Sequence, residues 1–403
     1  MHYEEQGERE CVMNQETTMG DRLKDNLKRF TLLMAFLVIV VMFQILTKGI
    51  LLVPQNVTNL IQQNSYILIL AIGMLMCIIT GGNIDLGVGS YVAFVGAIAA
   101  KLTIVDSNSS MVAIVITLLI GIAIGMLNGY FIAYRGIPAF ITTLASMLLF
   151  RGLTLVVLAG RTLAPFKPDY QIVSTGFLPA LAIWGGVKLS AIVIGALVCP
   201  FVIWVFIRKR SELKQFGSEV IPSGLFAIQL AGACAAILLL CFWLGRYEGI
   251  PSVLILLVVI YLIYYLITTR TVVGRHLYAL GGNERAARLS GIKTKRLKFL
   301  AFVNMGFLAS IAGIVFSGRL NAATPKAGSG FELDAIAACY IGGASASGGI
   351  GTVGGAVIGG LIMGVLNNGM SIMGINVDWQ QAIKGVVLLI AVLFDISSKS
   401  KQK

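Results

Sequence analysis

Polar side chains are rare within the long apolar runs of this sequence, and they are the residues that could do chemistry there. Such side chains are costly in hydrocarbon and usually face a bundle interior or an aqueous path. The candidates for lining such a path are Asn83, Asp85, Asn128, Thr142, Thr143, Asn367, Asn368 and Gln380. A wider set includes Glu332, Asp334 and Lys384. Asp85, Glu332 and Asp334 lie at predicted helix starts, where helix capping is favoured over substrate contact.

Other kinds of chemistry lack the residues that they need. No stretch matches the P-loop pattern, in which backbone amides and a lysine hold phosphates. The two histidines, His2 and His276, have no further ligands near them in the sequence, which argues against a metal site and a serine hydrolase. We therefore expect that this chain binds no metal or cofactor and is not itself an enzyme.

The segment Thr80–Ser90, TGGNIDLGVGS, interrupts the apolar sequence with four glycines and a carboxylate. It follows no soluble strand, so a nucleotide fingerprint is an unlikely interpretation. We interpret it as a glycine-broken junction near the cytoplasmic face, between two short helices. Asn83 and Asp85 would cap the second helix, and Gly87 and Gly89 would allow close packing.

These residues must be positioned by membrane helices. The chain has 403 residues, of which 57% are hydrophobic and 12% charged, and its mean hydropathy is +0.88. Apolar runs approach the ~20 residues that span ~30 Å of hydrocarbon. We predict an all-α integral membrane protein, a polytopic bundle of about 10–12 transmembrane helices. The expected spans are 30–47, 65–80, 85–101, 111–134, 138–160, 190–207, 222–244, 250–269, 299–318, 335–350, 353–373 and 381–396, with 65–80, 85–101 and 335–350 short or glycine-broken.

The charges predict the orientation of the bundle. The net charge of +13 arises mainly from basic residues between apolar runs, as the positive-inside rule expects. Most Lys and Arg fall on one side when both termini are placed in the cytoplasm. This gives a cytoplasmic tail over residues 1–29, a transmembrane domain over 30–396 and a second cytoplasmic tail over 397–403.

The longest predicted cytoplasmic loop covers residues 270–298. Its sequence predicts two short helical pieces around Gly281 and Gly282, with Asn283 as an N-cap, Glu284 in the first turn and Gly291 as the stop. A basic helix on the membrane surface and a docking helix for a cytoplasmic partner both fit this pattern.

Two further patterns concern the packing of the bundle. Residues 125–144 and 364–383 share a Leu-Asn-Gly-like motif followed by Gly-Ile and a new helix, which suggests a weak inverted repeat or a chance likeness of small-residue helices. The small-residue run 340–360 indicates close helix contact, either within one subunit or at a dimer or gate interface.

Several segments, taken together, resemble permease subunits of bacterial ABC-type monosaccharide importers, the ribose, xylose, arabinose and galactose group, with the closest likeness to multiple-monosaccharide permeases. The matching segments are residues 79–90, 136–155, 277–292, 330–370 and 379–385.

The resemblance implies a homodimeric pore in the bacterial inner membrane. It also implies a partner ATPase subunit with two nucleotide-binding domains, which uses ATP and Mg, and a periplasmic sugar-binding protein. The docking pattern of the family maps onto Gly282, Asn283, Glu284, Ala287 and Gly291. Arg285 is inserted in that pattern and makes the match imperfect. The neutral polar residues named above suit a neutral, hydroxyl-rich substrate.

The family core has about ten helices, so this chain is expected to carry two more, around 222–244 and 250–269 or their neighbours. Three rival functions remain open: a branched-chain amino-acid ABC permease, an ion-coupled secondary sugar carrier, and a membrane scaffold or sensor.

Overall fold

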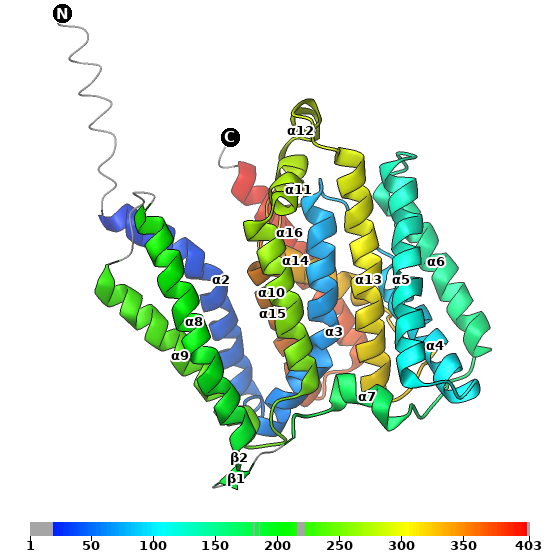
Figure 1. Cartoon of the computed structure of the whole chain (residues 1–403), viewed down its shortest axis with the longest axis horizontal. Helices are drawn as coiled ribbons and strands as arrows, with labels where there is room; N and C mark the ends of the chain where they lie inside the picture. Colours follow the sequence, from blue (N-terminus) through cyan, green and yellow to red (C-terminus); the bar gives the residue numbers. More distant parts are fainter. Residues whose placement is uncertain (1–18, 180–181, 185, 216–221, 401–403) are drawn as a thin grey trace, which may run out of the picture.

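A computed structural model describes residues 19–179, 182–184, 186–215 and 222–400. Its helices run roughly side by side (Figure 1). The short helix α12 (Glu284–Leu289) marks one end of the bundle, and α7 (Pro168–Thr175) marks the other. The start of α2 (Met19–Leu46) and the end of α16 (Val377–Ser400) lie toward the α12 end (Figure 1). Residues 1–18 and 401–403 of the predicted tails lie outside the described residues.

The fold is almost entirely helical, as predicted. The remaining helices are α3 (Pro54–Ile79), α4 (Val88–Ala100) with the π-helix η1 (Lys101–Val105), α5 (Ser110–Ala133), α6 (Ala139–Leu158), α8 (Leu189–Gln215), α9 (Ser223–Gly245), α10 (Ser252–Arg270), α11 (Val272–Gly282), α13 (Thr294–Leu320), α14 (Phe331–Ile341) and α15 (Val353–Ile372). The only sheet in the described ranges is a short antiparallel hairpin with two residues in each strand, β1 (Ile183–Trp184) and β2 (Val187–Lys188). Within those ranges, nine helices are long and apolar enough to cross a membrane.

Two predicted spans differ from the structure. The span 65–80 is part of the 26-residue helix α3, whose first half contains buried polar residues such as Gln62 and Asn64. Those residues shortened the apolar run in the sequence, although they pack inside the bundle. The span 335–350 is short and glycine-broken, as predicted, but its predicted end is wrong, because α14 has only 11 residues and ends at Ile341. Gly343, Gly348 and Gly349 then turn the chain with positive φ.

Helices α3 to α6 form one group and helices α13 to α16 form a second, and the two groups are arranged as an inverted repeat. In the first group, α3 and α5 run toward the α12 end; in the second, α13 and α15 run away from it. Their contacts correspond, since α13 packs against α5 and α4 as α3 packs against α15 and α14. Equivalent turns follow α5 and α15, where Gly136 and Gly374 have φ of +73° and +75°. These turns lie in the two sequence segments that suggested the repeat.

The short helices α4 and α14 begin next to each other inside the bundle. A Cβ atom on Gly89 would lie 2.1 Å from the carbonyl oxygen of Gly328, and one on Gly328 would lie 1.9 Å from that of Gly89. Only glycine permits this backbone contact, so any side chain at either position would push the two helix starts apart. Arg151 of α6 fixes the second start, because its guanidinium donates to the carbonyls of Ala327 at 2.5 Å and Pro325 at 3.4 Å.

Small residues allow α5 and α13 to touch along their length. Gly121, Gly125 and Gly129 lie four residues apart on α5 and face α13. An added Cβ would lie 2.5 Å from the carbonyl oxygen of Gly306, 2.5 Å from that of Phe302 and 2.8 Å from that of Phe299, respectively. Such spacing brings membrane helices into backbone contact, where dispersion forces are strongest.

Helices α8 and α9 pack against each other at the left-hand edge of the bundle (Figure 1), which makes them the best candidates for the predicted extra pair. Helix α10, which corresponds to 250–269, instead packs against α3, α7 and α15, so the neighbouring span 190–207 suits the pair better. The chain enters and leaves the pair at one place. Leu178 N donates to Ile250 O at 3.0 Å, and Ser252 N donates to Gly176 O at 2.8 Å.

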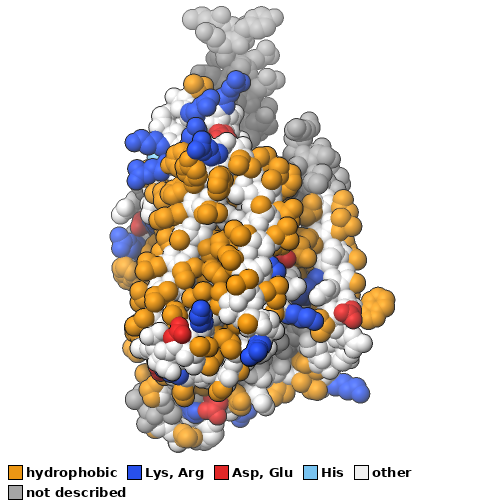
Figure 2. All heavy atoms as spheres, turned by 90° about the vertical axis from the view of Figure 1, so that its right-hand side faces the viewer, with side chains coloured by type: hydrophobic (Ala, Val, Ile, Leu, Met, Phe, Trp, Pro, Cys, Tyr) orange, Lys and Arg blue, Asp and Glu red, His pale blue; other side chains and the backbone are white. Residues whose placement is uncertain are grey.

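The surface carries an apolar belt. Figure 2 shows hydrophobic side chains over the middle of the face that bears α5 and α6, with a cluster of Lys and Arg toward the α12 end and further Lys and Arg scattered toward the opposite end. Exposed side chains of α6 such as Phe140, Leu148 and Val156 contribute to this belt. A surface of this kind matches hydrocarbon flanked by polar interfaces.

Candidate functional site

The loop between α10 and α13 contains two short helices joined at one residue. Asn283 ends α11 and begins α12, and its Oδ1 accepts a hydrogen bond from Ala286 N at 3.0 Å. Glu284 lies in the first turn, and Gly291 follows the helix with φ of +83°. The N-cap, the first-turn acid and the stop are therefore confirmed. The break lies one residue after the predicted Gly281 and Gly282.

Helix α12 is anchored on one side and exposed on the other. Ala287 is buried, and Glu284 forms an ion pair with Lys298 of α13 at 2.7 Å. Gly282 is exposed, and Leu289 is 82% exposed. An apolar side chain this exposed at the end of a membrane bundle suits a protein contact.

A basic cleft adjoins α12. It has a volume of about 650 Å³ and lies between the α12–α13 corner and the turn after α5. Its basic lining residues are Arg288, Lys293, Lys295, Arg296 and Lys298. This charge would attract an acidic surface.

The same loop contacts the linkers of both short helices. A Cβ on Gly281 would lie 1.8 Å from Ile79 O, where α3 ends, and 2.4 Å from Gly349 N, in the α14–α15 linker. Tyr278 Oη donates to Gly351 O at 2.7 Å. A displacement of α11 would therefore press directly on the segments that lead into α4 and out of α14.

Asp85 belongs to a buried hydrogen-bond chain that joins four segments. Its Oδ1 accepts from Gly87 N at 2.9 Å and from Tyr91 Oη at 3.1 Å. Asn128 Nδ2 donates to Tyr91 Oη at 2.7 Å, and Ser146 Oγ donates to Asn128 Oδ1 at 2.5 Å. Each of the four side chains is at most 4% exposed. This chain fixes the start of α4 to α5 and α6.

The predicted capping of α4 by Asn83 and Asp85 is wrong. The N-cap of α4 is Gly87, and no side chain caps it. Asn83 Nδ2 instead donates to Thr80 O at 3.2 Å, at the end of α3. Burial raises the pKa of the Asp85 carboxyl, in the loop between two spanning helices, to about 7; the hydrogen bonds from Gly87 and Tyr91 act in the opposite direction.

The structure does not bring the other predicted pathway residues into one site. Thr142 and Thr143 bond back to carbonyls of Pro138 and Ala139 at the start of their own helix. Asn368 forms a reciprocal amide pair with Asn56 of α3, at 2.9 and 3.2 Å.

Asn367 and Gln380 differ from these residues. The Oδ1 atom of Asn367 is buried without a hydrogen-bond partner among the described residues. Gln380 is half-buried and donates to Ser371 Oγ at 3.3 Å and to Ile375 O at 2.8 Å. A role of the predicted pathway residues in substrate passage stays a prediction.

Sequence reasoning missed Tyr91 and Ser146, which complete the Asp85 chain. Nothing local marks them, because their partners lie on other helices. It also did not connect Asp334 with Lys384, which form an ion pair at 3.0 Å between α14 and α16. The available signal was a lysine and an aspartate within apolar sequence, since intramembrane charges tend to pair.

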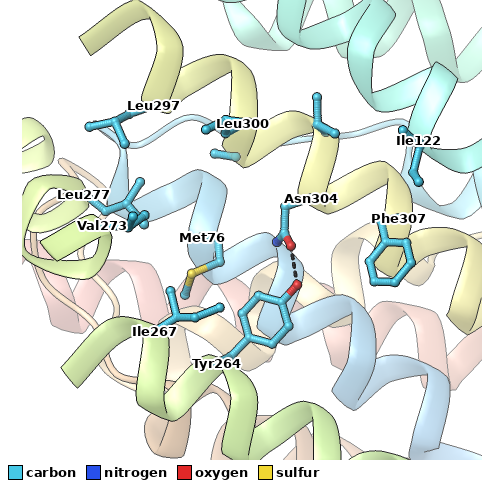
Figure 3. Close-up of a pocket in the computed structure, with 12 residues that line it drawn as sticks. Met76, Ile122, Tyr264, Ile267, Val273, Leu277, Leu297, Leu300, Asn304 and Phe307 are labelled. Atoms are coloured by element: carbon cyan, nitrogen blue, oxygen red, sulfur yellow. Dashed lines mark hydrogen bonds between the residues drawn. The ribbon is translucent and has the colours of Figure 1, made fainter. Parts of the chain in front are cut away.

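An apolar cavity of about 360 Å³ lies between α10, α11 and α13 (Figure 3). Tyr264 Oη donates to Asn304 Oδ1 within it, and Met76, Leu297 and Phe307 are among its apolar lining residues. One polar pair in apolar surroundings offers little to a hydroxyl-rich molecule. In the ranges that the structure describes, no group of three His, Cys, Asp or Glu residues is placed to hold a metal ion.

Comparison with known proteins identifies relatives along nearly the whole chain. The xylose transport system permease protein XylH of Haemophilus influenzae is 38% identical over 382 residues, which cover 93% of this chain and 98% of that protein. XylH of Escherichia coli K12 is 39% identical over 378 residues, 93% of each chain. The ribose import permease protein RbsC of Escherichia coli K12 is 34% identical and covers 90% of this chain and 92% of its own.

No solved structure matches the chain with statistical significance. The family model described as the permease component of the branched-chain amino acid transport system matches residues 56–392. That range includes both helix repeats and the α11–α12 loop. The chain therefore belongs to this family of transport-system permeases.

Proposed function

We propose that this chain is the membrane-spanning translocation subunit of an ATP-driven, binding-protein-dependent importer of monosaccharides. The main support for this proposal is the similarity of the chain, over 90% or more of its length, to permeases named for xylose and ribose. The description of the family names branched-chain amino acids, which keeps that substrate as the alternative. The sugar is favoured because relatives that match 90% or more of this chain are permeases named for xylose and ribose.

The exposed helix α12 supports coupling to an ATPase. Leu289 supplies an apolar contact, and the adjacent basic cleft supplies charge for an acidic surface. The contacts of Gly281 and Tyr278 with both linkers offer a direct mechanical route from the docking surface to α4 and α14. ATP and Mg would be bound and used by the partner. ATP-driven movement would then bias the permease between inward- and outward-facing states.

The remaining partners follow from this role. A chain with one docking loop matches one nucleotide-binding domain, so an ATPase with two such domains would engage two copies of the permease. A periplasmic sugar-binding protein would deliver substrate at the α7 end. The α12 end, with its basic residues, would then face the cytoplasm, together with both termini, and the bundle would lie in the bacterial inner membrane.

The association with an ATPase is tested by co-expression with the ATPase and binding-protein subunits of the same transport system. The expected result is a complex that contains two copies of this chain, with ATP hydrolysis stimulated by sugar-loaded binding protein. Stimulation by binding protein loaded with leucine would support the amino-acid alternative. Uptake by the chain alone that an uncoupler abolishes would support an ion-coupled carrier and contradict the proposal.

A further inference from the structure

One ion pair lies within the membrane domain and joins α14 to α16. Lys384 Nζ lies 3.0 Å from Asp334 Oδ2. The Asp334 side chain is 4% exposed and the Lys384 side chain is 24% exposed. Removing two charges from water is costly, and a close-packed apolar pair of similar volume often gives equal or better stability. Helix packing alone therefore does not explain this pair.

The pair retains unused hydrogen-bonding capacity. The second carboxylate oxygen of Asp334, Oδ1, is buried without a hydrogen-bond partner among the described residues. An ammonium group has three donors, and the contact with Asp334 uses one of them. A buried acceptor beside a partly exposed donor can bind neighbouring hydroxyls, because charge-assisted hydrogen bonds are about twice as strong as neutral ones.

A polar stripe on α16 leads to this pair from the α7 end. Gln380 and Lys384 are spaced by four residues on α16 and therefore share one face, and Asn376 lies four residues before Gln380, directly ahead of the first helical residue. Their exposure falls along the stripe, since Asn376 is exposed and Gln380 is half-buried. The exposed apolar residues Val386 and Leu389 project from another side of α16, as their helical spacing requires. The stripe thus does not lie on the most apolar side of the helix.

The equivalent contact in the first repeat is of a different kind. There, α4 is joined to α6 by Tyr91, Asn128 and Ser146, which are neutral, at most 4% exposed and bonded to one another. The corresponding helices α14 and α16 are joined by charges that are partly open. The Asp85 carboxyl that ends this chain is also sealed, at 1% exposure. A sealed chain suffices to hold a short helix in place, so the open charged pair has capacity beyond that task.

We propose that Asp334 and Lys384 form a hydroxyl-binding site in the translocation pathway, at the inner end of the Asn376–Lys384 stripe. This rests on the proposed function as a monosaccharide permease. The Asp334 carboxylate accepts a hydrogen bond from one sugar hydroxyl, and the Lys384 ammonium donates to a neighbouring one. The ligand class is a neutral polyol, and the site contributes to discrimination between sugars by their hydroxyl pattern.

The test uses the whole complex in proteoliposomes with saturating binding protein loaded with D-xylose or D-ribose. Asp334→Asn and Lys384→Met should each lower sugar uptake about tenfold, because each removes one charge-assisted hydrogen bond to the sugar. Binding-protein-stimulated ATP hydrolysis should remain, so fewer sugars cross per ATP. Lys188→Met, which breaks a surface ion pair with Glu248, is the matched control and should leave uptake unchanged.

Two further arms separate substrate contact from helix packing. The double variant Asp334→Leu with Lys384→Met restores an apolar contact and should assemble normally but still transport poorly; normal uptake by it would overturn the assignment. The ratio of 2-deoxy-D-ribose uptake to D-ribose uptake should be higher in Asp334→Asn than in the wild type, because the variant no longer gains from a contacted hydroxyl. An unchanged ratio for both single variants would also overturn it. A wild-type complex that takes up no monosaccharide would instead overturn the proposed function.

Discussion

The buried polar residues of this bundle fall into two kinds. In closed contacts the side chains are hydrogen-bonded to one another, and in open contacts a polar atom has no partner among the described residues. Asp85, Tyr91, Asn128 and Ser146 use one another and are sealed from solvent. Asn367 and Asp334 each keep a buried oxygen without a partner in the described residues. We expect closed contacts to hold helices together and open ones to be available to a passing polar molecule. This distinction assigns different roles even to the neighbours Asn367 and Asn368.

Replacement of Asp85 by asparagine tests the closed network through its pH dependence. The folded-state pKa of about 7 lies above the ordinary value, so the wild type loses stability as pH rises from about 4 through 7, when the buried carboxyl must ionise. Asp85→Asn keeps an acceptor oxygen without this cost. Relative to the wild type, the variant's melting temperature in detergent should be higher at pH 8 than at pH 4, because the ionisation cost is absent near pH 4 and complete above pH 7. A difference that is the same at both pH values would contradict the buried ionisation.

The Asn56–Asn368 pair tests whether Asn368 acts in packing. Asn368→Leu and Asn56→Leu should each destabilise the protein by about 1 kcal/mol, because each leaves an amide without its partner. The double variant should lose less than the sum of the two. Thermal unfolding of the four proteins measures this coupling. Strictly additive losses would mean that the pair contributes nothing as a unit.

Elements show where sequence reasoning succeeded and why it failed elsewhere. The α11–α12 loop was predictable because an asparagine N-cap, a first-turn glutamate and a stop glycine act within a few residues. The end of the short helix α14 was missed because the small apolar residues after Ile341 also suit a span. Only backbone contacts such as Gly342 with Gly355 show a packed linker there. The length of α3 was missed because tertiary packing buries its polar residues.

Leu289 provides a test of α12 as a docking element. Burying one leucine side chain contributes about 1.5–3 kcal/mol, so Leu289→Asp should weaken binding of the ATPase at least about tenfold. Co-purification or a titration with the purified ATPase measures this. The control is Leu320→Asp, at the other end of α13, where a partly exposed leucine is available. Equal losses in both variants would argue against docking through α12.

The α8–α9 pair is expected to be dispensable for the core. Because Leu178 and Ile250 are bonded neighbours, residues 179–249 can be replaced by a short Gly-Ser turn without moving Gly176 or Ser252. The shortened protein should insert and bind the ATPase, with a moderately lower melting temperature from the lost contact between Trp243 and Leu52. Failure of this variant to insert, while the full chain does, would make the pair part of the folding unit.

At the scale of the whole molecule, the all-α class and the inverted repeat were accessible from hydropathy, charge and one repeated motif. The twelve expected spans exceed the nine helices of the described residues that are long and apolar enough to cross a membrane. The meeting of α4 and α14 was not, because it depends on Gly89 and Gly328, which lie far apart in the sequence. This arrangement places two short helices where the loop between α10 and α13, through Gly281 and Tyr278, contacts both of their linkers. A docked ATPase could thus act on both repeats at once.

The most direct test of this account is sugar uptake into proteoliposomes that contain this chain with its ATPase and binding protein. The account predicts that D-xylose or D-ribose accumulates only when ATP and all three components are present, and that L-leucine does not. A non-hydrolysable ATP analogue should abolish accumulation. Accumulation of L-leucine in place of the sugars, or sugar uptake that persists without the ATPase, would contradict the central claim.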